Sequence, residues 1–292
     1  MYSHPLPTGH RFPMVKYELL TGQLIHEGTI SQENLFCPKP CSESILSWTH
    51  TKSYLDKLFN QKLSAAEQRR IGFPQSPELT LRELTITQGT IDCCHAALEF
   101  GVAFNIAGGT HHAFADRGEG FCLINDQAVA ANYLIQKKLA EKILIIDLDV
   151  HQGNGTAKLF ENNNSVFTFS MHGRHNYPFH KEKSDLDIAL EDGTDTTTYL
   201  NELQHNLINI IEEVQPDFCF YLSGVDILDT DKFGKLNVTL SGCRQRDEFV
   251  FSTLRGKSIP CVVSMGGGYS TDVNIIVEAH CNTFRVGLDK WS

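Results

Sequence analysis

The stretch Ile143-Leu-Ile-Ile-Asp-Leu-Asp-Val-His-Gln-Gly-Asn-Gly155 decides the fold that we expect for this chain. It begins with four apolar, β-favouring residues, the pattern of a strand buried on both faces of a parallel sheet. Asp147, Asp149 and His151 follow at alternate positions, so an extended chain points them to one side. Ligands of open α/β sheets bind at this end of a strand. The alternative is that the acids cap the next helix and His151 faces solvent.

Apolar runs that end in polar or glycine-rich segments recur along the chain. Further strands are predicted at residues 102–107, 166–171, 218–222 and 259–265. Helices are predicted near residues 15–20, 46–63, 87–100, 125–141, 156–160, 196–214 and 272–284. Strands that alternate with helices predict an α/β fold with a parallel sheet covered on both faces. Since no Pro-, Gly- or Ser-rich linker divides residues 1–292, we expect a single domain.

The composition excludes several classes of protein. No run of about 18 apolar residues could span a membrane, and the first residues lack the pattern of a secretory signal. Nine scattered cysteines without paired Cys-x-x-Cys units argue against a zinc ribbon and favour reduced thiols in the cytoplasm, or the nucleus of a eukaryote. The formal charge of −10 disfavours direct nucleic-acid binding and is compatible with cationic substrates such as lysine-rich segments or polyamines.

Polar side chains follow four of the predicted strands. Gly108-Gly-Thr-His-His112 follows residues 102–107, and the acids and histidine described above follow the organising strand. Asp226 follows the predicted strand at residues 218–222, and Tyr269 follows the one at residues 259–265. Because parallel strands end at the same edge of a sheet, we expect these four clusters to gather there, where α/β enzymes build their active sites.

Three of these residues have the chemistry of metal ligands. Asp149, His151 and Asp226 supply two oxygens and one nitrogen, the set that a catalytic Zn²⁺ needs beside an open position. Fe²⁺ or Co²⁺ would accept the same ligands, so the pattern leaves the metal's identity open. His111 or His112 could take a proton from water near such an ion. The alternative for these two histidines is a polar surface loop.

Tyr269 stands behind the glycine run Ser264-Met-Gly-Gly-Gly268. A backbone with so few side chains would let the tyrosine hydroxyl approach a substrate carbonyl and donate to a developing oxyanion. The alternative is a glycine turn whose tyrosine covers the core.

Five segments, taken together and in this order, resemble the zinc-dependent histone deacetylase family. They are Gly108-Gly-Thr-His-His112, Gly120-Phe-Cys-Leu-Ile-Asn125, Asp147-Leu-Asp-Val-His-Gln-Gly-Asn-Gly155, Gly224-Val-Asp226 and Gly266-Gly-Gly-Tyr269. The similarity runs from His10-Arg-Phe-Pro-Met14 to the C-terminus. Three features look most like the class IV branch, the histone deacetylase 11-like proteins and their bacterial relatives. These features are His-Gln-Gly-Asn-Gly at 151–155, Arg174-His-Asn-Tyr-Pro178 and Gly193-Thr-Asp195.

This resemblance implies the arginase/deacetylase fold, a single α/β domain with a mostly parallel, eight-stranded sheet. It implies one Zn²⁺ per chain at the three ligands proposed above. His112 would be the general base and then the acid for the leaving amine, with His111 as its electrostatic companion. Tyr269 would polarise the acyl carbonyl, and Asp147 would stand behind His111.

The resemblance also implies a structural monovalent cation, usually K⁺. Its site would be formed by Asp147, Asp149, His151, Ser170 and Met171. Asn154 occupies the place where class I members carry an Asp behind the second histidine. A neutral amide orients His112 without stabilising its imidazolium, so His112 should remain an available base near neutral pH.

The matching motifs would also form a channel for acyl-lysine. The substrate-binding residues implied are Gly109, Gly120, Phe121, Tyr177, Phe233 and Gly267. Phe233 stands where polyamine-selective relatives carry a gatekeeper Glu, and an aromatic ring cannot pair with a distal ammonium as a carboxylate does. Acyl-lysine in proteins or peptides is therefore favoured over acetylpolyamines. The alternative for Phe121 is packing in the core.

One departure from the family concerns the rim of the channel. Class I members grip the substrate backbone with an Asp on a rim loop. The corresponding loop at residues 71–79 offers Gln75, Ser76 and Glu78, none of which is a clear equivalent.

The acyl length and the oligomeric state stay open. Phe12, Met14 and Phe121 could line an apolar acyl pocket, whereas Arg11 matches an internal Arg of the family and would make the pocket floor polar. We expect a zinc-dependent amidohydrolase that removes acetyl or longer fatty acyl groups from the lysine side-chain amine of proteins. The alternatives are an acetylpolyamine amidohydrolase, an arginase-like enzyme with two metals, and a catalytically weak scaffold that binds acyl-lysine.

Overall fold

The computed structural model describes residues 2–291, and its centre is a six-stranded sheet in the order β1-β6-β5-β2-β3-β4. Every neighbouring pair of strands is parallel. The strands are β1 Val102–Asn105, β2 Ile143–Asp147, β3 Val166–Gly173, β4 Leu186–Leu190, β5 Phe218–Leu222 and β6 Cys261–Ser264. The predicted parallel α/β architecture and its five strands are therefore confirmed, with β4 added at one edge.

The eight strands implied by the resemblance are wrong for this chain, because the sheet of the described residues has six. The long connections that could have supplied more form only isolated bridges, such as Glu119↔Cys122 and Leu228↔Val238. These connections instead form turns and bends at the polar edge of the sheet.

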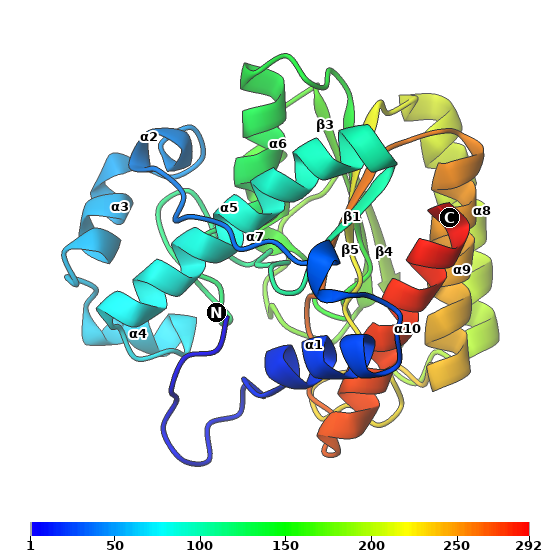
Figure 1. Cartoon of the computed structure of the whole chain (residues 1–292), viewed down its shortest axis with the longest axis horizontal. Coiled ribbons are helices and arrows are strands. Elements are labelled where there is room, and N and C mark those ends of the chain that lie inside the picture. Colours follow the sequence, from blue (N-terminus) through cyan, green and yellow to red (C-terminus); the bar gives the residue numbers. More distant parts are fainter. Residues whose placement is uncertain (1, 292) are drawn as a thin grey trace.

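Helices cover both faces of the sheet (Figure 1). They are α1 Lys16–His26, α2 Glu43–Leu46, α3 Lys52–Phe59, α4 Ala65–Ile71, α5 Pro77–Phe100, α6 Asp126–Gln136, α7 Asn154–Phe160, α8 Thr196–Val214, α9 Leu240–Gly256 and α10 Val273–Trp291, with a 3-10 turn η1 at Gln32–Asn34. In Figure 1, α2, α3 and α4 gather at one end of the molecule, and α8 and α9 lie at the other. α10 packs against both α1 and α9.

Alternate residues of the central strands enter two separate cores. In β2, Ile143 and Ile145 pack with α5 and α6, whereas Leu144 and Ile146 pack with α8 and α9. All four side chains are at most 1% exposed. A strand has a side-chain period of two, so a strand covered on both faces must be apolar at every position, as residues 143–146 are.

Helix α8 has the bounds that its apolar spacing predicts, and Pro216 follows its end. Ile208 is 45% exposed, whereas Ile210 and Ile211 are buried on the face that packs against the core. Helix α5 begins ten residues before the predicted position, because Ser76 caps its N-terminus and Pro77 occupies the first turn.

Helices α4 and α9 were not predicted. α4 is a short helix with a capping box between Ser64 and Glu67, a sequence signal that would have revealed it. The buried stripe of α9 contains Arg246 and Asp247, which are charged and fully buried. Such residues interrupt an apolar period, so only their tertiary partners explain why they lie inside.

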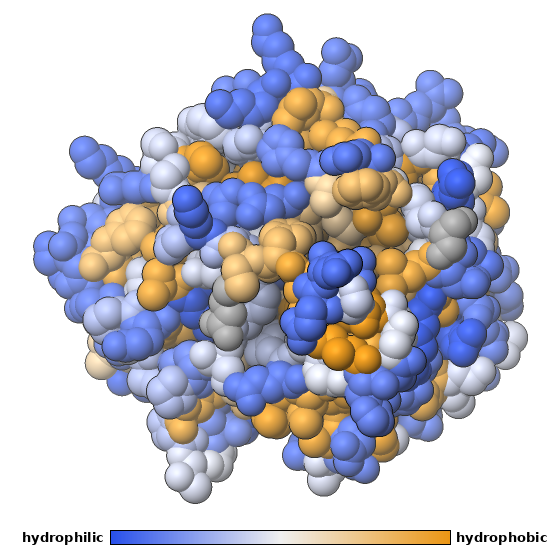
Figure 2. Space-filling model, in the orientation of Figure 1, coloured by the Kyte–Doolittle hydropathy of each residue, from blue (hydrophilic) through white to orange (hydrophobic). Residues whose placement is uncertain are grey.

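All nine cysteines are free thiols in the part of the chain that the structure describes, and eight of them are buried or packed in the interior. Among residues 2–291, no helix combines the length and the apolar character needed to cross a bilayer. Figure 2 shows that the face seen in Figure 1 is hydrophilic around its periphery, with apolar patches between polar side chains. Scattered apolar residues of this kind are ordinary on a protein surface.

Candidate active site

The carboxyl ends of four neighbouring strands lie level across the sheet. Asp147 of β2 pairs with Leu222 of β5, Leu222 with Ser264 of β6, and Ser264 with Asn105 of β1. Each strand then leads into one of the polar segments singled out from the sequence. The prediction that these segments gather at one edge of the sheet is confirmed.

Asp149, His151 and Asp226 come together at this edge, and one atom from each lies within 4.8 Å of the others. The Nδ1 of His151 lies 2.9 Å from Oδ1 of Asp149 and 3.1 Å from Oδ2 of Asp226. Asp149 is 1% exposed, and Asp226 is fully buried. Two buried carboxylates and an imidazole therefore share one small volume.

The chemistry of this group suits a divalent cation. Burial and the neighbouring charge of Asp149 raise the pKa of Asp226 to about 7, because two carboxylates this close repel each other. Burial opposes a charge on His151, but its hydrogen bonds to the two carboxylates raise its pKa to about 10. A positive ion among two oxygens and one nitrogen would relieve this repulsion, and the donor set matches the ligands of Zn²⁺.

Backbone groups hold the outer oxygens of the two acids. Gly267 N donates to Oδ2 of Asp149 at 2.7 Å, and Val150 N donates to Oδ1 of Asp226 at 2.9 Å. A Cβ atom at Gly267 would collide with the Asp226 carboxylate, so this position needs glycine. These contacts orient the carboxylates before any ligand arrives.

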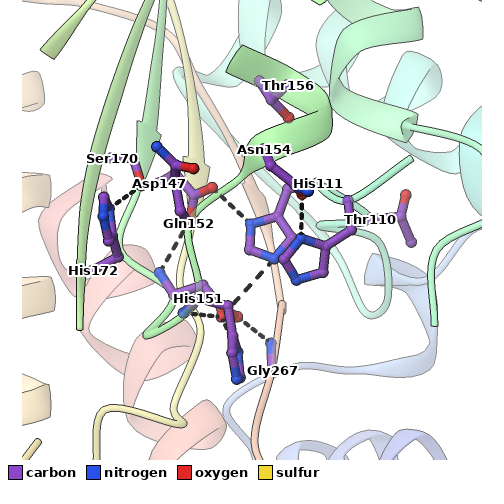
Figure 3. Close-up of polar contacts among 12 residues, drawn as sticks. Thr110, His111, Asp147, His151, Gln152, Asn154, Thr156, Ser170, His172 and Gly267 are labelled. Carbon is purple, nitrogen blue, oxygen red and sulfur yellow. Dashed lines mark hydrogen bonds and ion pairs between the residues drawn. The ribbon is translucent and has the colours of Figure 1, made fainter. Parts of the chain in front are cut away.

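The two histidines that follow β1 have different partners, and Figure 3 shows the first of them, His111, with its partner Asp147. His111 Nδ1 donates to Oδ2 of Asp147 at 2.7 Å, and His112 Nδ1 lies 2.7 Å from Oδ1 of Asn154. Burial disfavours a charge on His111, but Asp147 outweighs it and raises the pKa. Burial, His111 and His151 lower the pKa of His112 well below its usual range. His112 is therefore the neutral member of the pair through burial and its two histidine neighbours, and the hydrogen bond to Asn154 opposes this shift.

Glu119 fixes which nitrogen of His112 is free. Its carboxylate lies 3.5 Å from Nδ2 of Asn154 and accepts a 2.8 Å hydrogen bond from the Tyr177 hydroxyl. A carboxylate only accepts, so the amide nitrogen of Asn154 faces Glu119 and the amide oxygen faces His112. His112 Nδ1 must then carry the hydrogen, which leaves the lone pair on Nε2 available for a proton. No sequence motif had pointed to Glu119.

Tyr269 lies beside the group formed by Asp149, His151 and Asp226. Its ring centroid is 6.4 Å from that of His151 and 5.0 Å from that of Phe233. Its backbone N–H donates to Oδ2 of Asp231 at 2.6 Å, which fixes the turn after the glycines. Burial, Asp149 and Asp226 raise the pKa of Tyr269 well above its usual value. The hydroxyl therefore keeps its proton and can donate it in a hydrogen bond.

Aromatic side chains form the walls between this group and the surface. Phe121 and Tyr177 line an open cavity of about 420 Å³ that reaches His112, His151 and Tyr269. A Cβ atom at Gly120 would lie 2.6 Å from Cδ2 of His112, so only glycine lets the wall approach this closely. The predicted channel residues Gly120, Phe121, Tyr177 and Phe233 thus line one cavity, and Gly109 and Gly267 line the space beneath it.

A model of the histone deacetylase domain matches residues 10–284. The chain belongs to the histone deacetylase family. It is 31% identical to histone deacetylase 2 of Arabidopsis thaliana over 96% of this chain and 75% of that protein. It is 42% identical to an uncharacterised protein of Picosynechococcus sp. over 99% of this chain and 96% of that protein. The crystal structure of a histone deacetylase homologue from Aquifex aeolicus superposes with a TM-score of 0.82 at 25% identity, covering 98% and 81% of the two chains.

Membership in the histone deacetylase family makes the chain a hydrolase of the deacetylase type. The family is zinc-dependent and acts on acetylated lysine, and Asp149, His151 and Asp226 form a possible metal site. The matches include plant and bacterial members, among them the acetoin utilization protein AcuC of Staphylococcus aureus at 25% identity over 96% of this chain and 78% of that protein.

The internal cation of this histone deacetylase family member is not Arg11. Arg11 is exposed and lines the outer cavity, with its guanidinium 5.7 Å from the Phe233 ring centroid. Lys16 and Arg82 are buried cations beside the site: Lys16 Nζ donates to Gly266 O at 3.1 Å, and Arg82 lines the inner cavity. The spacing of the N-terminal motif misled the prediction because the segment turns at Pro13 and brings Lys16 inward at the start of α1.

Other predicted residues lie away from the chemistry. Met14 is buried, but it does not line the inner cavity that Phe12 and Phe121 enter. Gln75 accepts a hydrogen bond from Leu63 N, and Ser76 caps α5. These two rim candidates therefore hold the fold.

The residues implied for a monovalent cation lie behind His111. Asp147 and Ser170 are register partners on β2 and β3, and both line a small cavity. Met171 follows Ser170 in β3, and Asp149 N donates to Oδ1 of Asp147 at 3.2 Å.

Proposed function

We propose that this protein is a zinc-dependent deacylase that hydrolyses the amide between an acyl group and the side-chain amine of lysine in proteins or peptides. The observation that carries the proposal is the convergence of three would-be ligands with a neutral His112 and a protonated Tyr269 at one end of a walled cavity. A scaffold that only binds acyl-lysine would not require these three ligands together with the base and the hydroxyl donor. An arginase-like enzyme would need two clusters of metal ligands, whereas the described residues contain a single cluster, that of Asp149, His151 and Asp226.

Asp149, His151 and Asp226 would hold one Zn²⁺. When bound there, zinc polarises the acyl carbonyl and lowers the pKa of water. The buried acids would remain deprotonated beside such an ion. The proposed roles of the remaining residues concern the proton and the developing negative charge.

His112 Nε2 would accept a proton from the attacking water, because Asn154 occupies its Nδ1 hydrogen. As the C–N bond breaks, the same nitrogen would return that proton to the departing amine, and the second proton of the water would pass from the new carboxyl group to the amine, leaving a carboxylate and a protonated amine. His111 would carry the positive charge that Asp147 stabilises and would hold His112 neutral. Tyr269 would donate a hydrogen bond to the carbonyl oxygen as its charge grows.

Acyl-lysine is proposed over acetylpolyamine because the walls near the surface carry no acid. Phe233 lines the outer cavity where a polyamine-selective relative would carry a carboxylate, and Arg11 lies over its ring. A second ammonium group on the substrate would meet a positive charge there. Gly109, Gly120, Phe121, Tyr177 and Gly267 would surround the lysine chain and its amide.

A short acyl group is proposed because two cations lie at the inner end of the site. Arg82 lines the inner cavity, and Lys16 Nζ lies 5.3 Å from the Phe12 ring centroid and 5.8 Å from the Tyr269 ring centroid. Burial lowers the pKa of Lys16 to about 8, although Asp226 and Asp149 oppose this shift. A long alkyl chain would have to lie against these polar groups, whereas acetate would be attracted to them.

Three further assignments complete the proposal. A structural K⁺ would bind near Asp147, Asp149, His151, Ser170 and Met171. Asn154 and the motifs at 151–155 and 174–178 favour the class IV branch. Residues 1–292 would act as a single catalytic domain in the cytoplasm, where free thiols such as those observed persist.

A panel of substrates tests the proposal. The protein, loaded with zinc, is assayed on acetyl-lysine and myristoyl-lysine peptides, acetylated polyamines and arginine, each with and without a chelator. We expect chelator-sensitive turnover of the acetyl-lysine peptide to exceed that of all the others. Undiminished turnover after the metal is removed would contradict the mechanism, and faster turnover of an acetylpolyamine would contradict the substrate.

A further inference from the structure

The mouth of the cavity carries an excess of positive charge. Five of the chain's 25 Lys and Arg residues line it, and none of its 35 Asp and Glu residues does so in the part of the chain described. These residues are Arg11, Arg69, Arg70, Lys232 and Lys235. In a chain whose formal charge is −10, a cavity without a single carboxylate is a local reversal of the overall charge.

Most of this charge is not neutralised by neighbours. We call Arg11, Arg69, Arg70 and Lys232 the rim cations; all four are exposed. Lys235 lies 3.6 Å from Asp192, which also contacts His175. The rim cations form no ion pair with any carboxylate among residues 2–291, although many other surface Lys and Arg residues of this chain do. Their charge is therefore available to a ligand.

The segments that carry the rim cations are bonded to the walls of the site. Gly120 N donates to Arg70 O at 3.1 Å, which attaches the end of α4 to the wall beside His112. Phe233 N donates to Asp231 Oδ1, whose second oxygen accepts from Tyr269 N. The backbone that presents these charges is thus fixed relative to the acyl amide.

We propose that the rim cations bind acidic side chains on either side of the acylated lysine, so that the preferred substrate is an acidic peptide segment. This inference rests on the proposed function and names its substrate class. Charge complementarity carries it: the rim cations come from three separate segments around the opening, so carboxylates before and after the lysine would both find partners. The Asp of class I relatives holds the backbone of the substrate, whereas this rim would attract the acidic side chains of the substrate by charge.

Other anionic or cationic ligands fit less well. A polyamine or a lysine-rich segment is repelled by the same charges that attract carboxylates. Nucleic acid presents a long row of phosphates and needs an extended basic surface, whereas the charge excess here is confined to one cavity of a chain with net charge −10.

The experiment uses the zinc-loaded full chain and three peptides of equal length with a central acetyl-lysine, flanked on both sides by Glu, Gln or Lys. We expect kcat/KM to fall by about tenfold from the Glu peptide to the Lys peptide at low salt, mainly through KM. In about 0.5 M NaCl the ratio should shrink to about twofold, because exposed charges are screened. Fluorescence anisotropy of the same labelled peptides should give the same order of affinity.

The variant Arg69→Gln/Arg70→Gln/Lys232→Gln should lose most of the preference for the Glu peptide. Arg244→Gln is the matched control: Arg244 is an exposed arginine on α9 that does not line the cavity, and its loss should leave the ratio intact. Equal binding and turnover of the three peptides by the unaltered protein would overturn the inference while leaving the proposed function standing.

Absence of turnover on all three peptides would overturn the proposed function, and the anisotropy ranking would still decide the inference about charge. A single-stranded oligonucleotide that binds more tightly than the Glu peptide would overturn the assignment of the rim cations to an acidic peptide.

Discussion

The cluster of carboxylates at the inner end of the site and the cations at its mouth are opposite in charge and differ in how their charges are held. At the inner end, the carboxylates of Asp147, Asp149 and Asp226 are buried, and each has hydrogen-bond partners. At the mouth, the rim cations are exposed and without carboxylate partners among the described residues. A buried charge must be paired because leaving it alone costs several kcal/mol, whereas an exposed charge is stabilised by water.

The difference separates two tasks of the enzyme. The inner end is organised before a substrate arrives, as catalysis of amide hydrolysis requires. The mouth has charges that become paired only when a ligand binds. Substitutions at the inner end should therefore affect turnover strongly, and substitutions at the mouth should change the choice of substrate by smaller factors.

The largest effect is expected from Asp226→Asn. Loss of one carboxylate should weaken zinc binding and lower kcat/KM on an acetyl-lysine peptide by about 10³-fold or more, beyond the 10- to 100-fold loss usual for outer contacts of a metal site. Bound zinc is measured by elemental analysis beside the activity. Asp229→Asn, an exposed acid three residues further along the same loop, is the control. Full zinc content in Asp226→Asn would contradict the ligand assignment.

Tyr269→Phe should lower kcat by about 10²-fold with zinc still bound, because it removes one donor to the oxyanion and no metal ligand. The measurement pairs steady-state kinetics with zinc content. Tyr133→Phe, which removes a hydroxyl that contacts His95 outside the site, should leave kcat unchanged. Near-normal turnover by Tyr269→Phe would exclude its proposed role.

Asn154→Asp tests the neutral state of His112. A carboxylate beside Nδ1 would raise the pKa of His112, which burial and the neighbouring histidines now hold well below its usual range. A base works only when it is deprotonated, so the acidic limb of the pH profile should move to higher pH by about one unit, with up to about tenfold lower kcat/KM on that limb. A profile of kcat/KM against pH that does not move would show that position 154 does not set this pKa.

The smallest effect is expected at the mouth. Phe233→Glu introduces one carboxylate among the rim cations and should raise kcat/KM on an acetylpolyamine by about fivefold, the range of a single exposed ion pair. The ratio of acetylpolyamine to acetyl-lysine peptide turnover is the measurement, and Phe233→Leu is the uncharged control. A change larger at this position than at Tyr269 would contradict the division between the two regions.

Much of the site could be predicted because its signals are local. Asp147, Asp149 and His151 lie on one strand end, and the tandem histidines and the glycine run before Tyr269 are short motifs. Glu119 escaped prediction because its role depends on Asn154 and Tyr177, each more than thirty residues away in the chain. Arg11 was predicted to be the internal cation, whereas Lys16 is the buried one. Both are basic residues near the same motif, and only packing distinguishes the exposed residue from the buried one.

The sequence by itself determined the parallel α/β sheet, its central strand, the three residues that form a possible metal site and the pair of histidines. It could do so because strand periodicity and the order of polar segments after strands are properties of the chain's local pattern. Tertiary structure alone decided that α9 forms with Arg246 and Asp247 inside, that Lys16 points inward, and that cations from three distant segments meet around one opening. Their meeting depends on how separate elements pack, and the summed charge of −10 gives no sign of it.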